Sequence, residues 1–152
     1  QPDGWTQIGG DGSEPGRDIL LGTWDTGGLS SGAVYTLRLQ VVRTDNTLET
    51  AYVSVTVDNK PPTVTLTAPA PGEPYSLEDD ETISLEAQPE DDVQLATVAF
   101  YVAGALVATT EEWPHRATWT IDAAGEHTIW AVAADMAGNE AASERVRVTV
   151  EE

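Results

Sequence analysis

The sequence predicts an all-β protein made of two β-sandwich domains in tandem, covering residues 1–59 and 60–152. Short runs in which apolar and polar residues alternate recur along the chain, as in half-buried strands, and no stretch of useful length has helical periodicity. Two consecutive prolines, Pro61 and Pro62, separate the first set of runs from the second. Because proline cannot donate to a strand ladder, we expect an extended joint between two packed bodies at residues 57–64.

The first domain contains a predicted hairpin. Residues 35–43 place Tyr35, Leu37, Leu39 and Val41 on one face, the turn-forming residues 44–47 follow, and residues 51–57 alternate again. Shorter strands are expected over residues 4–9 and 19–26. About four strands are too few for an independent sandwich, which needs about seven. The missing strands would come from upstream sequence, from the second domain, or from another molecule that adds strands.

The second domain has enough strands to be complete. Turn signals separate seven runs at the spacing expected of a sandwich. The apolar positions of these runs are Val64 and Leu66; Ile83, Leu85 and Ala87; Val98, Phe100 and Val102; Leu106 and Val107; Ala117, Trp119 and Ile121; Ile129, Ala131 and Ala133; and Val146, Val148 and Val150.

An internal repeat relates the two domains. Residues 22–46 align with residues 117–139, so that Trp24 corresponds to Trp119, Tyr35 to His127 and Leu37 to Ile129. The alternating valines 53, 55 and 57 correspond to valines 146, 148 and 150. Both halves are therefore expected to be variants of one sandwich, with Trp130 on an outward face like Arg38.

Three motifs carry a family resemblance. The strings VDNKPPTVTLTAP, VQLATVAFYVAG and AVAADMAGNEAA resemble the bacterial immunoglobulin-like (Big-type) domains of secreted and surface proteins. LGTWDTGGLSSGAVYTLRLQVV resembles the last strands of similar modules, including those at the C-terminus of some bacterial penicillin-binding proteins. The resemblance implies two immunoglobulin-like domains, the first incomplete, and an extracellular or cell-surface location. Its motifs specify core and turns, and they specify function weakly.

Composition excludes several classes of function. The net charge is −19, from 26 acidic and 7 basic residues, so the chain lacks the clustered Lys and Arg that nucleic acid or anionic lipid requires. No apolar run is long enough for membrane insertion. The chain has no cysteine, so disulfide and thiol chemistry are excluded.

Acidic and amide side chains are expected to converge at the joint. The start of the first strand and two of the loops lie at the same end of such a sandwich, and these carry Asp58 and Asn59, Asp91 and Asp92, and Asp135 and Asn139. Ca²⁺ prefers carboxylate and carbonyl oxygens, so this set predicts a possible calcium site that would stiffen the joint. The alternative is that these residues make turns or are solvated, since no contiguous calcium-loop motif is present.

A second candidate surface is the outward face of the last sheet. Its members are Tyr101, Trp130, Val132, Arg145 and Arg147, and the loop residue Trp113 has no evident core role. Aromatic residues and arginine are enriched at binding hot spots, which favours contact with a partner subunit or a glycan. The alternative is an ordinary cation–π pair between arginine and Trp130.

Catalysis has little support, because neither His115 nor His127 belongs to a recognisable motif and no serine has a positioned base. The sequence therefore predicts a non-enzymatic extracellular structural or assembly module of a surface protein or filament. Its partners would be other copies or neighbouring domains, and the first domain would self-associate by strand complementation. The alternative is a glycan- or cell-wall-binding accessory module attached to a cell-wall enzyme.

Overall fold

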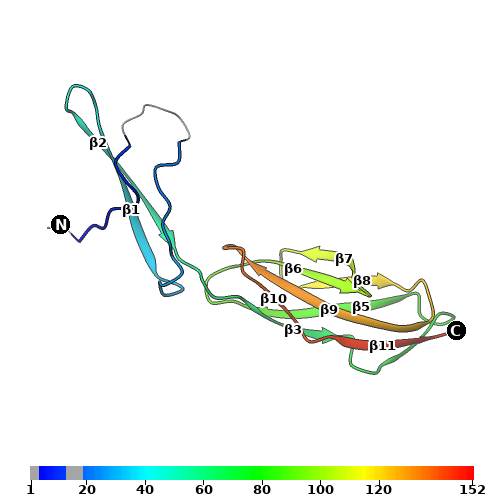
Figure 1. Cartoon of the computed structure of the whole chain (residues 1–152). Coiled ribbons are helices and arrows are strands. Elements are labelled where there is room, and N and C mark those ends of the chain that lie inside the picture. The colour runs from blue at the N-terminus through cyan, green and yellow to red at the C-terminus, as the bar shows by residue number, and fades with distance from the viewer. Residues whose placement is uncertain (1–3, 13–18) are drawn as a thin grey trace.

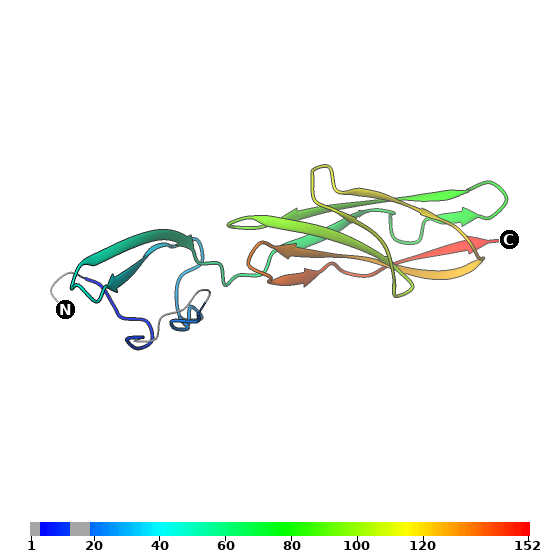
Figure 2. The ribbon, with the colours of Figure 1, turned by 90° about the horizontal axis from the view of Figure 1, so that it is seen from above.

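The computed structural model describes residues 4–12 and 19–152, and within them it contains eleven strands and no helix (Figure 1). In this part of the chain no helix is long and apolar enough to cross a membrane. The strands form two bodies that lie end to end on either side of the joint (Figure 2). The C-terminus lies at the end of the second body away from the joint. The all-β prediction is confirmed.

The first body is built on the predicted hairpin. Strand β1 (Val34–Val42) pairs antiparallel with β2 (Leu48–Thr56), and Leu37 lies opposite Val53. The turn is closed by a hydrogen bond from Arg43 N to Thr47 O at 2.9 Å. Within it, Asn46 takes a positive φ of 65°, a conformation that asparagine tolerates better than most residues.

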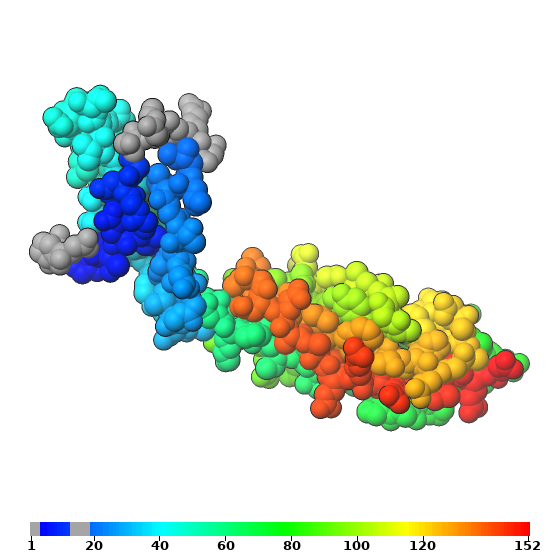
Figure 3. Space-filling model, viewed as in Figure 1, coloured from blue at the N-terminus to red at the C-terminus, as the bar shows by residue number. Residues whose placement is uncertain are grey.

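The strands expected over residues 4–9 and 19–26 are not regular strands. Gly9 has a φ of 70°, which interrupts an extended conformation. The two segments approach each other through glycine backbones instead: a Cβ on Gly9 would lie 2.9 Å from Leu21 O, and one on Gly22 would lie 3.0 Å from Ile8 O. The first body therefore has one two-stranded sheet among its described residues, with these segments laid beside it (Figure 3).

The second body is a sandwich of two sheets. Its strands are β3 (Thr63–Ala68), β4 (Pro74–Ser76), β5 (Thr82–Glu90), β6 (Leu95–Val102), β7 (Ala105–Thr110), β8 (Arg116–Thr120), β9 (Gly125–Asp135), β10 (Glu140–Ala142) and β11 (Val146–Glu151). One sheet has the order β3-β5-β8, and the other has the order β4-β11-β9-β6-β7, with β10 also pairing with β9. All seven predicted strands are present. The short β4 and β10 were not predicted, because three residues are too few to show a period.

The inner faces of the two sheets form the core. Ile83 and Leu85 on β5 pack with Phe100 on β6 and Ile129 on β9, and all four are almost completely buried. Trp119 is half-buried and packs against this cluster. Alternation in the sequence identified this core because successive strand residues point to opposite faces of a sheet.

The internal repeat is reproduced in the pairing. Leu37 lies opposite Val53 in the hairpin, and the aligned residue Ile129 lies opposite Val146, the equivalent of Val53, in the sandwich. The aligned aromatic pairs also make the same contact. The ring centroids of Trp24 and Tyr35 are 5.2 Å apart, and those of Trp119 and His127 are 4.8 Å apart. The hairpin therefore corresponds to β9 and β11, two neighbouring strands of the larger sheet.

Candidate functional site

The joint is held to both bodies by the two residues that precede Lys60. Asn59 Nδ2 donates to Thr26 O at 2.6 Å and to Leu29 O at 3.1 Å, which fixes the joint to the first body. On the other side, Asn139 Nδ2 donates to Asp58 O at 3.3 Å. Ser31 adds a further bond, since its hydroxyl donates to Asp58 Oδ1 at 2.9 Å. The sequence analysis did not predict this role of Ser31, because no local pattern links Ser31 to Asp58, which lies 27 residues further along the chain.

Three carboxylates come together at this joint. Asp58 follows β2, Asp91 directly follows β5, and Asp135 ends β9. One oxygen from each lies within 4.8 Å of the others. Two unit charges at such a distance repel by about 3 kcal/mol at an effective dielectric constant of about 20. Among the described residues, no Lys or Arg nitrogen lies within 4.0 Å of these three carboxylates to offset that repulsion.

Asp135 is the most buried of the three and is held in place by its own loop. Its Oδ1 accepts hydrogen bonds from the backbone N–H groups of Ala137 and Asn139, at 2.8 and 2.9 Å, and its Oδ2 accepts one from Asn139 Nδ2 at 2.7 Å. Burial alone would raise the pKa of Asp135, but these hydrogen bonds outweigh it and hold the pKa below its ordinary value. Asp135 therefore stays ionised at neutral pH.

The other residues expected at the joint have different roles. Asn139 contacts Asp58 and Asp135 as a hydrogen-bond donor. Asn59 turns its amide nitrogen toward the first body. Asp92 lies outside the group of three, and its Oδ2 is 3.7 Å from Lys60 Nζ. The structure thus brings together three of the six residues as a carboxylate group, with Asn139 bridging two of them.

The outward face of the larger sheet carries a stack of three side chains. The rings of Tyr101 and Trp130 are nearly parallel, at an interplanar angle of 7° with centroids 5.3 Å apart. The Arg145 guanidinium lies 4.8 Å from the centre of the Trp130 ring. Because β6 and the start of β11 flank β9 on opposite sides, Tyr101 and Arg145 approach the indole from opposite sides. The Trp130 indole is therefore already engaged by two side chains of its own domain.

Three other members of that candidate surface lie outside the stack. Arg147 pairs with Glu126 at 3.6 Å. Val132 lies further along β9, opposite Ala99 on one side and Ala142 on the other. Trp113 lies in the loop between β7 and β8, contacts His115 edge-on, and is 69 % exposed.

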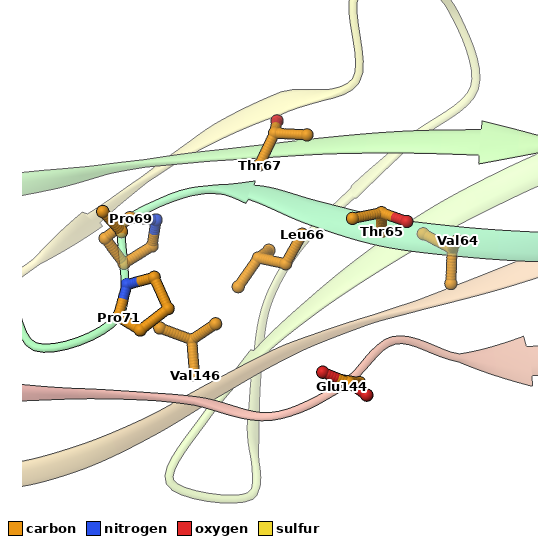
Figure 4. A pocket seen from close by; sticks show the side chains of 9 residues that line it. Val64, Thr65, Leu66, Thr67, Pro69, Pro71, Glu144 and Val146 are labelled. Atoms are coloured by element: carbon orange, nitrogen blue, oxygen red, sulfur yellow. The ribbon is translucent and has the colours of Figure 1, made fainter.

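A shallow groove of about 520 Å³ lies between β3 and the segment that leads into β11. Figure 4 shows the apolar side chains of Leu66, Pro71 and Val146 beside it. Among the residues that the structure describes, Glu144 is the one ionisable side chain that lines this groove.

Two buried side chains of types that often take part in catalysis, Ser143 and His115, make hydrogen bonds within the domain. The buried Ser143 lies between β10 and β11, where its hydroxyl accepts a hydrogen bond from Ala131 N at 3.0 Å and so continues the ladder with β9. The buried His115 is bonded to Thr110 Oγ1 through Nδ1 at 2.9 Å. Both side chains are therefore used in contacts within the immunoglobulin-like domain.

Comparison with known proteins settles the nature of the second body. Residues 62–131 match the family model of a bacterial Ig domain. The second body is therefore similar to a bacterial immunoglobulin-like domain over these residues. Immunoglobulin-like modules of this kind are commonly extracellular or surface-associated and typically non-catalytic. The resemblance seen in the sequence motifs is therefore confirmed for the second body, whereas the motif at residues 21–42 lies outside the match.

One solved structure supports the similarity in fold. The chain is similar to the fibronectin(III)-like modules of Clostridium thermocellum CbhA, with 26% identity and a TM-score of 0.54, over 59% of this chain and 96% of that one. It also matches a lytic polysaccharide monooxygenase of Jonesia denitrificans, with 23% identity and a TM-score of 0.37, over 55% of this chain and 60% of that one. A third match is dimeric latent PorU of Porphyromonas gingivalis, with 18% identity and a TM-score of 0.43, over 81% of this chain and 12% of that one. Scores as low as the last two bear on neither fold nor function. No curated protein matches the chain in sequence.

The environment of His115 predicts a pH dependence for the immunoglobulin-like domain. Burial lowers the pKa of His115, so the folded domain holds it neutral while the unfolded chain protonates it near about pH 6.5. The free energy of unfolding therefore has its full value above that pH. It decreases as the pH falls below it, by at most about 1.4 kcal/mol per pH unit. Urea unfolding at pH 7.5 and 5.5 measures the loss, which should be smaller in a His115→Gln variant. Equal losses in the two proteins would contradict a neutral, buried His115.

Proposed function

We propose that the chain is a non-enzymatic structural and assembly module of a bacterial surface protein or filament, and that it associates through the apolar face of its hairpin. The observation that carries this proposal is the exposure of that face. Leu39, Val41 and Val53 are 45 %, 45 % and 55 % exposed. By the internal repeat they correspond to Ala131, Ala133 and Val146, which are 0 %, 0 % and 8 % exposed.

The difference in exposure arises because the described residues of the first body form only one sheet. In the immunoglobulin-like domain, the face of β9 and β11 is covered by the sheet β3-β5-β8. In the hairpin, the contact between Trp24 and Tyr35 covers the end next to the joint. The turn-side half projects away from the joint (Figure 3). Removing apolar surface from water contributes about 25 cal/mol per Å², so strands that covered this half would be bound favourably.

The partner that we propose is a second copy of the chain. The charges of the hairpin cancel, since Arg38 and Arg43 balance Asp45 and Glu49, whereas the chain as a whole carries −19. The hairpin therefore adds no net charge of its own to the repulsion between two acidic chains. Two apolar two-stranded sheets that stack face to face make a minimal sandwich, and identical faces satisfy a two-fold axis.

Self-association tests this proposal. In sedimentation equilibrium between about 10 and 200 µM, we expect the parent chain to associate and a Leu39→Glu variant to associate at least tenfold more weakly, because the charge enters the apolar face. Val42→Glu is the matched control, since Val42 lies on the same strand but on the opposite face and is also exposed. A parent chain that stays monomeric throughout would contradict a second copy as the partner. Equal weakening by the two variants would contradict the apolar face as the contact.

A second candidate function rests on Trp113, whose exposed indole suits stacking on a sugar ring. Under this alternative the chain is a glycan-binding accessory module of a cell-wall enzyme. Pull-down on insoluble peptidoglycan should then retain the parent and lose Trp113→Ala. Trp130→Ala should still be retained, because Tyr101 and Arg145 already cover that indole. If peptidoglycan does not retain the parent chain, this alternative is wrong. In either case, the Trp113→Ala variant should self-associate as the parent does, because Trp113 is not part of the hairpin.

A further inference from the structure

Among the described residues, one carboxylate oxygen at the joint has no hydrogen-bond partner. Asp91 Oδ2 accepts a hydrogen bond from Val93 N at 3.0 Å, which holds the side chain in place. The other oxygen, Oδ1, is shielded from solvent and has no partner among the described residues. A buried charged oxygen that is left unsatisfied is destabilising, so it normally has a ligand, an ion or a water. This oxygen belongs to one of the three carboxylates that converge at the joint.

We propose that Asp58, Asp91 and Asp135 form a binding site for a hard divalent cation, of which Ca²⁺ fits best. Ca²⁺ binds oxygen ligands at about 2.3–2.6 Å, so two ligands on opposite sides of one ion are about 5 Å apart. The three carboxylate oxygens lie within 4.8 Å of one another, which is compatible with a single shared ion. A divalent cation would also remove the repulsion among the three charges.

The side chains are already held in place for this role. Asp135 is fixed by the loop that follows β9, through two backbone N–H groups and Asn139. Asp58 is held by two hydrogen bonds to its Oδ1, one donated by Ser31 Oγ at 2.9 Å and one by Lys60 N at 3.2 Å. Three carboxylates leave several of the six to eight positions of Ca²⁺ to water and backbone carbonyls, as in sites of moderate affinity.

The nearest lysine does not take the place of the cation. Lys60 Nζ pairs with Asp92, one residue beyond Asp91 and outside the group of three. The sequence thus separates two acidic neighbours into different roles: one forms an ordinary surface ion pair, and the other supplies a buried oxygen without a partner. Asp92 is therefore a natural control for the charge of this loop.

A bound cation would connect the joint to two loops of the immunoglobulin-like domain. Asp58 belongs to the joint and bonds to Ser31 of the first body, whereas Asp91 and Asp135 belong to the second. Cation binding would then stiffen one body relative to the other. This inference does not rest on the hairpin's proposed association, and either can fail without the other.

The test is a calcium titration of the whole chain in 150 mM NaCl, followed by isothermal titration calorimetry and by thermal unfolding. We expect one Ca²⁺ per chain, with a dissociation constant in the range of about 10⁻⁴–10⁻³ M typical of extracellular modules, and a melting temperature that rises with calcium. Asp91→Asn should weaken binding at least tenfold, while Asp92→Asn, which removes the same charge one residue away, should change it by less than about threefold.

Circular dichroism establishes that each variant is folded. If Asp91→Asn does not fold, Asp58→Asn takes its place, since Asp58 lies in the joint rather than in the sandwich. Absence of calcium binding by the parent would overturn the proposal. Several weak sites per chain, or equal weakening by Asp91→Asn and Asp92→Asn, would also overturn it, because both results indicate attraction of cations to the acidic surface in general.

Discussion

The arrangement of this chain depends on the hydrogen bonds made by Asp58 and Asn59. Pro61 and Pro62 make the joint extended but cannot attach it to anything, because proline has no N–H to donate. Attachment comes from amide side chains: Asn59 donates to two carbonyls of the first body, and Asn139 of the second body donates to the carbonyl of Asp58. The three converging carboxylates and the end-to-end placement of the two bodies both follow from these few bonds.

The two bodies contain the same strand pair in different surroundings. In the immunoglobulin-like domain, Ile129 and Val146 face a second sheet and are buried, and this packing supplies most of the stability of a sandwich. In the first body, the equivalent residues Leu37 and Val53 keep the same pairing without that sheet. A two-stranded sheet is marginal on its own, so the hairpin needs the segments laid beside it and gains from any strands that cover its apolar face. That difference links the fold to an assembly role.

Much of the fold could be predicted from the sequence, because alternation places strand residues on faces. It located the seven main strands, and the internal repeat aligned Leu37 with Ile129 and Val53 with Val146, which the structure pairs in the same way. It failed for residues 4–9 and 19–26, where apolar residues suggested strands but a positive φ at Gly9 prevents an extended ladder. At the joint, the meeting of Asp58, Asp91 and Asp135 followed from which loops share one end of a sandwich. The unpartnered oxygen of Asp91 and the pairing of Asp92 with Lys60 depend on side-chain directions, which a sequence pattern does not contain.

The most direct test of the joint is a measurement of the distance between the two bodies. The chain has no cysteine, so spin labels can be attached at introduced cysteines, one replacing Asp45 in the hairpin turn and one replacing Asp122 in the loop before β9. Pulsed electron paramagnetic resonance should give one narrow distance distribution, which broadens when Asn59 and Asn139 are both replaced by alanine. A distribution that is already broad in the parent, or that is unchanged by the two replacements, would contradict a joint ordered by these side chains.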